Sequence, residues 1–176
     1  MEVKKMAKLS KQRLIFGMFL LVLIVAAEIV LAHLKFPAWP AFMVMIFFFE
    51  SHMDIKKAPS ILVGGAVGIL CILLTKYFIM AVAPALGVEV SKLLIICLIV
   101  YAIVAFGEIL PIVFNNYAFM YFLVSGIAVK VLDPAPNLFL WIGIELVVGV
   151  IFIAGIIGIG KIMAKMGPPP TDQPGH

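Results

Sequence analysis

Long runs of apolar residues alternate with short clusters of proline, glycine and polar residues along this chain. A transmembrane helix needs about 20 consecutive apolar residues to cross the hydrocarbon core of a bilayer. Four of the runs approach or exceed that length, and the other two are clearly shorter. The clusters between them contain proline or paired asparagines, which interrupt or end helices. The pattern predicts helices over the runs 14–32, 41–50, 61–82, 93–110, 117–129 and 138–160.

The first run follows a basic segment, as the core of a signal peptide does. Its apolar stretch, 14–32, is longer than the roughly 7–15 residues of such a core. Ala32-His33-Leu34 is also a poor cleavage site. We therefore interpret this run as an uncleaved first transmembrane helix.

Composition supports a membrane protein and excludes other classes. Hydrophobic residues make up 65% of the chain and charged residues 12%, against about 45–50% and about 25% in globular proteins. Such a chain needs the lipid bilayer as its partner. The net charge of +4 comes from basic residues at chain ends and in short loops. This distribution argues against nucleic acid as a binding partner. Cys71 and Cys97 lie singly in apolar runs, so we expect no disulfide, no metal and no cofactor. Without a nucleophile–base set or a phosphate-binding glycine motif, the chain is not expected to be an enzyme.

Two short motifs recur at one spacing. Ala41-Phe42-Met43 returns as Ala118-Phe119-Met120, and Ala58-Pro59 returns as Ala135-Pro136, each 77 residues later (41 to 118, 58 to 135). This offset maps residues 13–89 onto 90–166, three helices onto three. Because three is odd, the second copy would enter the bilayer from the opposite side, as in inverted-repeat transporters.

The repeat sets the domain organisation that we expect. The fold class is all-α, a polytopic membrane protein with six transmembrane helices in two inverted three-helix repeats. A cytoplasmic basic segment, 1–12, precedes a single membrane domain, 13–166, and a disordered polar tail, 167–176, follows it.

Charges and tryptophans indicate how the chain lies in the membrane. Nine Lys or Arg residues fall on the side of the termini and four on or near the other side. The positive-inside rule then predicts that both termini lie in the cytoplasm. We expect the chain to be a multi-pass protein of the cell (inner) membrane. Trp39 and Trp141 lie near the expected outer interface, where indole rings favour the headgroup region.

The second run of each repeat is short and follows a helix breaker. Short, interrupted segments at matching positions point to the binding site of a transporter, because their free backbone groups must face protein or a water-filled cavity. In the first repeat this segment offers the aromatic ring of Trp39, and in the second the polar groups of Asn115, Asn116 and Tyr117. These groups suit a small polar or weakly cationic solute. The alternative is that the asparagines form an ordinary loop.

Acidic residues inside or next to the apolar runs are further candidates. Glu28, Glu108 and Glu145 lie in runs where a charge is costly, so such residues usually face the protein interior and mark solute pathways. Glu108 would share a helical face with Tyr101. A protonated carboxyl that bonds a neighbouring helix is the structural alternative. Glu50 and His52, at the end of the second run, are candidates for a gate.

Small residues predict close helix packing. Gly64 and Gly68 have the Gly-x-x-x-Gly spacing of a packing face in the third run. Gly155, Gly158 and Gly160 in the last run indicate a similar face.

Two further motifs carry a family resemblance. Phe36-Pro37-Ala38-Trp39-Pro40-Ala41-Phe42 opens the second run, and Leu110-Pro111-Ile112-Val113-Phe114 precedes the fifth. With these motifs and its length, the chain resembles a family of small bacterial inner-membrane proteins defined by a domain of uncharacterised function. The resemblance covers residues 13–160. It implies a six-helix membrane protein and no catalytic residues.

These observations predict a channel or transporter for a small polar solute, with the pathway between the two short helices. Because six helices enclose little space, we expect a homo-oligomer. One alternative is a membrane-embedded substrate-binding subunit of a multi-component transporter. The other is a scaffold that transports nothing.

Overall fold

The computed structural model describes residues 11–131 and 137–165, which are helical apart from the connections between helices. Most of the expected basic segment 1–12 and all of the tail 167–176 lie outside the described residues. The helices in the described ranges are α1 (Lys11–His33), α2 (Trp39–Glu50), the 3-10 turn η1 (Ile55–Lys57), α3 (Ala58–Leu86), α4 (Val88–Phe106), α5 (Asn116–Val131) and α6 (Leu138–Lys165).

Helix lengths fall into two classes. Four helical segments, 11–33, 55–86, 88–106 and 138–165, are long and apolar enough to cross a membrane. In contrast, α2 has 12 residues and α5 has 16, which at about 1.5 Å per residue gives roughly 18 and 24 Å. Neither of these reaches across a hydrocarbon core of about 30 Å without tilt or help from its flanks. The two short helices are the ones that the sequence predicts to be short.

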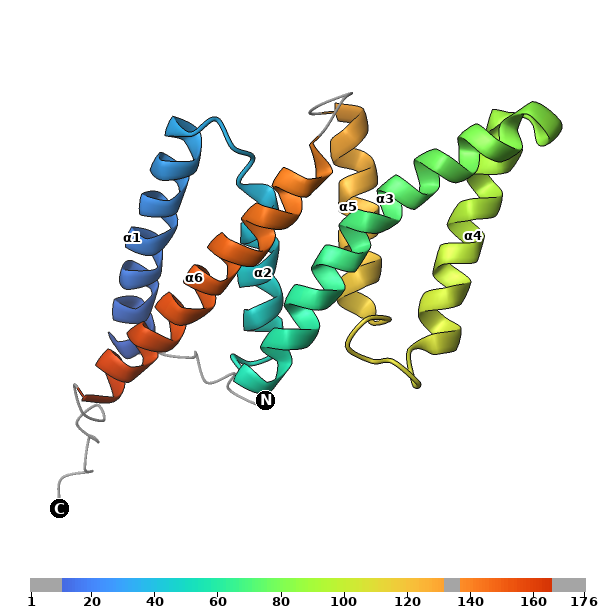
Figure 1. Cartoon of the computed structure of the whole chain (residues 1–176). Coiled ribbons are helices and arrows are strands. Elements are labelled where there is room, and N and C mark those ends of the chain that lie inside the picture. Colours follow the sequence, from blue (N-terminus) through green and yellow to red (C-terminus); the bar gives the residue numbers. More distant parts are fainter. Residues whose placement is uncertain (1–10, 132–136, 166–176) are drawn as a thin grey trace, which may run out of the picture.

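Successive helices alternate in direction, so α1 begins and α6 ends on the same side of the molecule (Figure 1). The long helices α3 and α6 contact each other at the centre and run in opposite directions (Figure 1). On α3 pack α4 and α5, and on α6 pack α1 and α2. We call these two sets the α3 group (α3, α4, α5) and the α6 group (α1, α2, α6). Each group therefore contains one helix from one half of the chain and two from the other.

One pair of helix starts follows the sequence offset: α5 begins 77 residues after α2 (39 to 116). The residues before Lys11 lie outside the described ranges, so α1 gives no start to compare with that of α4. The equivalent of the start of α3 is residue 135, which lies outside the described residues, and the described part of α6 begins at Leu138.

Glycines permit the closest helix contacts, as the sequence predicts. A Cβ at Gly68 of α3 would lie 2.4 Å from the backbone oxygen of Ala118 in α5. A Cβ at Gly149 of α6 would lie 2.7 Å from Val44 in α2. Gly155 contacts Leu23 of α1 in the same way, whereas Gly158 has no neighbouring atom within 4 Å of that position. The packing face of α6 thus includes Gly155 but not Gly158 or Gly160.

Two helix ends differ from the expectation. The predicted run ends at residue 82, but α3 continues through Pro84 to Leu86 and stops at Gly87, whose φ of 80° is accessible to glycine. Because Pro84 has no N–H, α3 lacks one backbone hydrogen bond near its end. α4 ends at Phe106 instead of residue 110. Glu108 therefore lies in a turn and shares no helical face with Tyr101.

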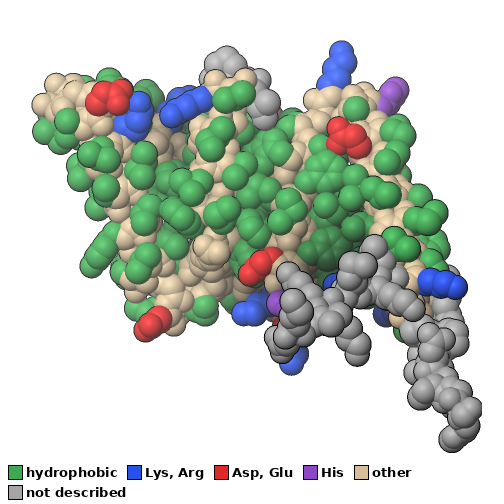
Figure 2. Space-filling model, turned by 180° about the vertical axis from the view of Figure 1, so that it is seen from behind, with side chains coloured by type: hydrophobic (Ala, Val, Ile, Leu, Met, Phe, Trp, Pro, Cys, Tyr) green, Lys and Arg blue, Asp and Glu red, His purple; other side chains and the backbone are tan. Residues whose placement is uncertain are grey.

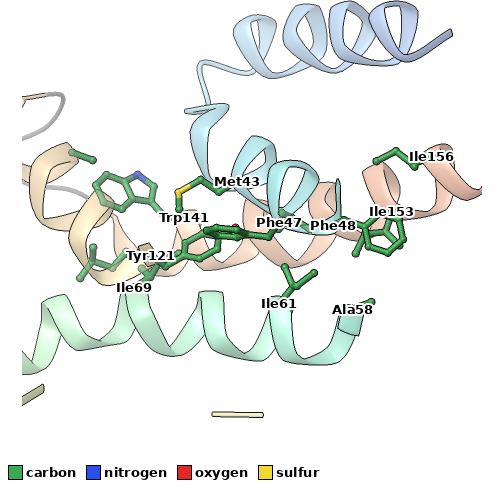
Figure 3. Close-up of a cluster of buried hydrophobic side chains, with 13 residues drawn as sticks. Met43, Phe47, Phe48, Ala58, Ile61, Ile69, Tyr121, Trp141, Ile153 and Ile156 are labelled. Carbon is green, nitrogen blue, oxygen red and sulfur yellow. The ribbon is translucent and has the colours of Figure 1, made fainter. Parts of the chain in front are cut away.

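The hydrophobic core lies where α2, α3, α5 and α6 meet (Figure 3). Phe47 and Phe48 of α2, Ile61 of α3, Tyr121 of α5 and Trp141 of α6 point into it. The outward faces are also apolar: on α1 only Leu31 is buried, and hydrophobic side chains cover the middle of the molecule in Figure 2. An apolar exterior around an apolar core is typical of a chain in contact with lipid.

Candidate functional site

The candidate site lies where the start of α2 meets α5 and α6. The indole of Trp39 packs edge-on against that of Trp141, with ring centroids 5.1 Å apart and an interplanar angle of 84°. It also lies 6.3 Å from the ring of Tyr121. Trp141 is only 3% exposed. The two indoles therefore pack within the protein, and Trp141 does not anchor the chain in the headgroup region as the sequence suggested.

Among the described residues, Glu145 of α6 is the only buried Asp, Glu, Lys or Arg, and its side chain is 0% exposed. It faces α3 at a glycine: a Cβ at Gly65 would lie 2.5 Å from Glu145 Oε1 and 2.8 Å from Tyr121 Cε2. Gly65 thus makes room for the carboxyl group and for the tyrosine ring together. Any larger residue at Gly65 would compete with them for this space.

Four buried polar side-chain atoms have no hydrogen-bond partner within the described part of the chain. They are Trp39 Nε1, Ser125 Oγ and both carboxyl oxygens of Glu145. Ser125 lies one helical turn after Tyr121 on α5, and it is also fully buried. An unpaired buried polar group costs about 1–3 kcal/mol. We call Trp39, Tyr121, Ser125 and Glu145 the central polar cluster.

One member of the cluster is paired. The Tyr121 hydroxyl donates a hydrogen bond to the backbone oxygen of Pro40, with an O···O distance of 2.6 Å. This bond joins α5 to the first turn of α2. That turn has no side-chain cap, because Ala38 stands at the N-cap position and Pro40 carries no N–H.

The other end of the contact between α2 and α5 is aromatic and partly exposed. The ring of Tyr117 packs at a tilt against that of Phe47, with centroids 5.1 Å apart and an interplanar angle of 55°. Its hydroxyl lies 3.5 Å from Glu50 Oε2, at the limit of hydrogen bonding. Since Tyr117 meets the end of α2 and Tyr121 meets its start, the two short helices run antiparallel beside each other.

Both polar groups of the Asn115 side chain form hydrogen bonds that cap α5 and connect it to α3. Its Oδ1 accepts from the N–H of Ala118, which is N-cap geometry. Its Nδ2 donates to the backbone oxygens of Ser60, Pro111 and Ile112 at 2.9–3.1 Å. The side chain also fills the space beside Gly64. Asn116 follows as the exposed first residue of the helix. The structure therefore brings neither amide into the central polar cluster.

Other candidates lie away from the cluster. Glu28 is exposed on α1, and Glu108 is exposed in the α4–α5 connection. Glu50 is exposed at the end of α2. His52 is exposed in the turn that follows, where its φ is 58°. Of the residues that the sequence singles out, Trp39 and Glu145 both lie near Tyr121, and Tyr117 lies one helical turn before Tyr121 on α5.

The sequence analysis missed Tyr121, Ser125 and Gly65. One signal was available, since Tyr117, Tyr121 and Ser125 recur at intervals of four, which aligns polar side chains on one face of a helix. Nothing in the sequence indicates that Gly65, rather than Gly64, lies opposite a carboxyl group. In the described ranges, no three His, Cys, Asp or Glu side chains come together as metal ligands.

Comparisons with known proteins provide no relative: no family model matches the chain, and neither the curated proteins nor the solved structures include a significant match.

Proposed function

We propose that this chain is a gated transporter or channel for a small polar solute, and that the solute passes between α2 and α5 beside Glu145. The observation that carries the proposal is the central polar cluster. Unpaired donors and acceptors lie at the meeting point of two helices that are too short to cross a bilayer. Intramembrane ionisable groups of this kind usually mark solute pathways.

The inverted repeat that the sequence predicts would support the same interpretation. The start of α5 follows that of α2 by 77 residues, and equivalent helices run in opposite directions in Figure 1. The contacts are equivalent too, since α5 packs on α3 as α2 packs on α6. Transporters of this architecture bind their solutes at the interface of the repeats. We place the six helices in an inner membrane with both termini in the cytoplasm, because Lys and Arg are more frequent on that side.

The pathway is closed in this structure. Tyr121, Ser125 and Glu145 are each 0% exposed, so a solute reaches them only if the helices move. The α3 group and the α6 group are the natural moving parts, because each is held together by its own helix contacts. A rocking motion of one group against the other would separate α2 from α5.

The chemistry of the cluster defines the class of solute. The carboxyl oxygens of Glu145 accept hydrogen bonds and Trp39 Nε1 donates one, while Ser125 Oγ can do both. A solute that carries N–H groups as well as an acceptor would satisfy all three. Urea and small amides fit this description better than carboxylates, which carry no N–H group and which the Glu145 side would repel.

A solute-flux screen tests the proposal. The purified chain in proteoliposomes would be exposed to urea, ammonium, small amides, alcohols and short carboxylates, and flux would be followed by light scattering. We expect Glu145→Gln to reduce flux of the transported solute at least about tenfold. Glu89→Gln, which changes an exposed carboxylate outside the cluster, should not. Equal flux in both variants for every solute would overturn the proposal.

A second variant separates transport from folding. Glu145→Leu replaces an unpaired buried carboxyl group by an apolar one of similar size. It should raise the unfolding temperature in detergent while abolishing flux, because such polar groups are retained at a cost in stability. A loss of both stability and flux would assign Glu145 to the structure alone.

The alternative of a binding subunit for a multi-component transporter uses the same cluster. It is favoured by the outward face of α1, which is apolar and almost entirely exposed, as an interface with a partner or a second copy would be. Tight solute binding without flux in proteoliposomes would support it.

A further inference from the structure

A second recess in the molecule lies away from the central polar cluster. It is a groove of about 680 Å³ between α3, α4 and α5 that reaches the start of α6. Its wall is mainly apolar and includes Ile72, Ile79, Ile96, Phe122 and Ile127. Within the described residues α4 makes its main contacts with α3 and few with α5, so the groove opens sideways between α4 and α5. We call it the lateral groove.

Three lysines from three helices line this groove: Lys76 from α3, Lys92 from α4 and Lys130 from α5. Lys92 lies near the start of its helix and Lys130 near the end of its own. In Figure 1 these two helix ends lie on the side away from the beginning of α1. The basic groups therefore belong to the end of the groove that faces the outer side of the membrane in the proposed orientation.

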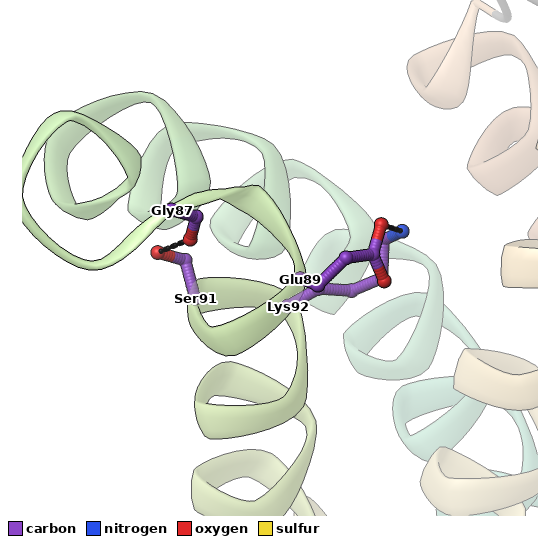
Figure 4. Close-up of polar contacts among 4 residues, drawn as sticks. All are labelled: Gly87, Glu89, Ser91 and Lys92. Carbon is purple, nitrogen blue, oxygen red and sulfur yellow. Dashed lines mark hydrogen bonds and ion pairs between the residues drawn. The ribbon is translucent and has the colours of Figure 1, made fainter.

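The lysines are only partly neutralised by the protein. Lys92 Nζ lies 3.1 Å from Glu89 Oε1, in the first turn of α4 (Figure 4). Among the described residues, neither Lys76 nor Lys130 takes part in an ion pair. In Figure 2, basic and acidic side chains lie close together at the upper left edge of the molecule. The groove thus combines an apolar wall with a net positive rim.

We propose that the lateral groove binds one anionic phospholipid, with an acyl chain along the apolar wall and the phosphate between Lys76 and Lys130. Apolar pockets with basic residues between transmembrane helices recognise anionic headgroups in this way. The long lysine side chains reach the headgroup region while their methylene groups cover apolar surface. The volume lies in the range of about 300–1,000 Å³ that is usual for ligand sites.

Charge argues against other occupants. In a symmetric dimer the same surface of two copies meets itself, and here that contact would bring two sets of lysines together. A small polar solute would leave most of the apolar wall without an apolar contact. An anionic amphiphile would contact the apolar wall with its acyl chain and the lysines of the rim with its headgroup.

Binding of defined lipids to the whole chain tests this proposal. Intact complexes in detergent would be titrated with phosphatidylglycerol and with phosphatidylcholine of the same acyl chains, and bound lipid would be counted by mass spectrometry. We expect phosphatidylglycerol to bind at least about tenfold more tightly. Lys76→Gln with Lys130→Gln should weaken phosphatidylglycerol binding roughly thirtyfold and leave phosphatidylcholine binding unchanged. The matched control is Lys56→Gln with Lys57→Gln, two exposed lysines of η1.

A variant of the wall tests the acyl chain separately. Gly126 lines the groove, and a Cβ there would meet only Ile72, at an ordinary 3.7 Å. Gly126→Leu should therefore fold, fill part of the groove and weaken binding of both lipids. Equal affinity for the two lipids, or a lysine effect matched by the control pair, would overturn the proposal. So would a change from dimer to monomer in Gly126→Leu with lipid binding intact, because it would assign the groove to a second copy.

Discussion

The Tyr121 hydroxyl donates a hydrogen bond to the Pro40 backbone oxygen across 2.6 Å, and this contact joins the middle of α5 to the first turn of α2. The two residues are 81 positions apart in the chain and belong to different helix groups. The same two helices also meet at Tyr117 and Phe47, so tyrosine side chains of α5 contact both the start and the second half of α2. The bond to Pro40 is buried, whereas the contact of Tyr117 with Glu50 is exposed.

Tyr121→Phe removes this hydrogen bond and keeps the aromatic ring. We expect a loss of about 1 kcal/mol in the free energy of unfolding, because a buried carbonyl oxygen loses a partner. If separation of α2 from α5 opens the pathway, solute flux in proteoliposomes should increase. The measurements are thermal unfolding in detergent and flux of the same preparation. Tyr101→Phe, at a side chain that is 71% exposed, should change neither. Unchanged stability in Tyr121→Phe would show that this bond does not hold the helices together.

Gly68→Ala tests the closest approach of α3 and α5. The new Cβ would lie 2.4 Å from the Ala118 backbone oxygen and 2.9 Å from the Phe122 backbone nitrogen. Backbone atoms cannot move aside as side chains can, so we expect destabilisation of about 1–3 kcal/mol. Gly143→Ala in α6 is the control, since no atom lies within 4 Å of its Cβ position. It should be neutral or stabilise the helix by up to about 1 kcal/mol. Similar unfolding temperatures for the two variants would contradict the packing described here.

Asn115→Ala removes the cap of α5 and the tether to α3. The free energy of unfolding should fall by about 1–2 kcal/mol, because the Ala118 N–H loses its acceptor and three carbonyl oxygens lose a donor. Asn116→Ala, at the exposed neighbouring position, should change stability by less than about 0.5 kcal/mol. Thermal unfolding of both variants decides between the structural role and the solute-binding role that the sequence suggested. A stable Asn115→Ala that lacks solute flux would restore the solute-binding role.

The general architecture was accessible from sequence, because it depends on properties that act over whole helices. Apolar length predicts the four long helices, and the short runs predict α2 and α5. The spacing of Gly64 and Gly68 predicts a packing face, which the structure confirms against α5 and Asn115. The inverted arrangement of the two halves and the transport function remain predictions.

The site was less accessible, because it depends on which side of each helix faces inward. Glu28 and Glu145 look equivalent in sequence, each surrounded by apolar residues. The structure exposes Glu28 on α1 and buries Glu145 completely. The difference arises from neighbours far along the chain: α1 contacts mainly α6, whereas Glu145 lies against Gly65 of α3. A single sequence does not contain this pairing of helices.

The way in which the two halves share their third helices has an evolutionary consequence. α3, from the first half of the chain, packs on α4 and α5 of the second half. α6, from the second half, packs on α1 and α2 of the first half. Under the proposed duplication, a lone three-helix ancestor would have lacked the helix contacts that form the core here. It would have folded as a pair of identical subunits inserted in opposite orientations, with the third helix of each packed on the other. Fusion of the two genes would then have fixed one orientation for each half and allowed their sequences to diverge. Glu145 is an example, because the equivalent position in the first half (68 to 145) is Gly68, which has no carboxyl group.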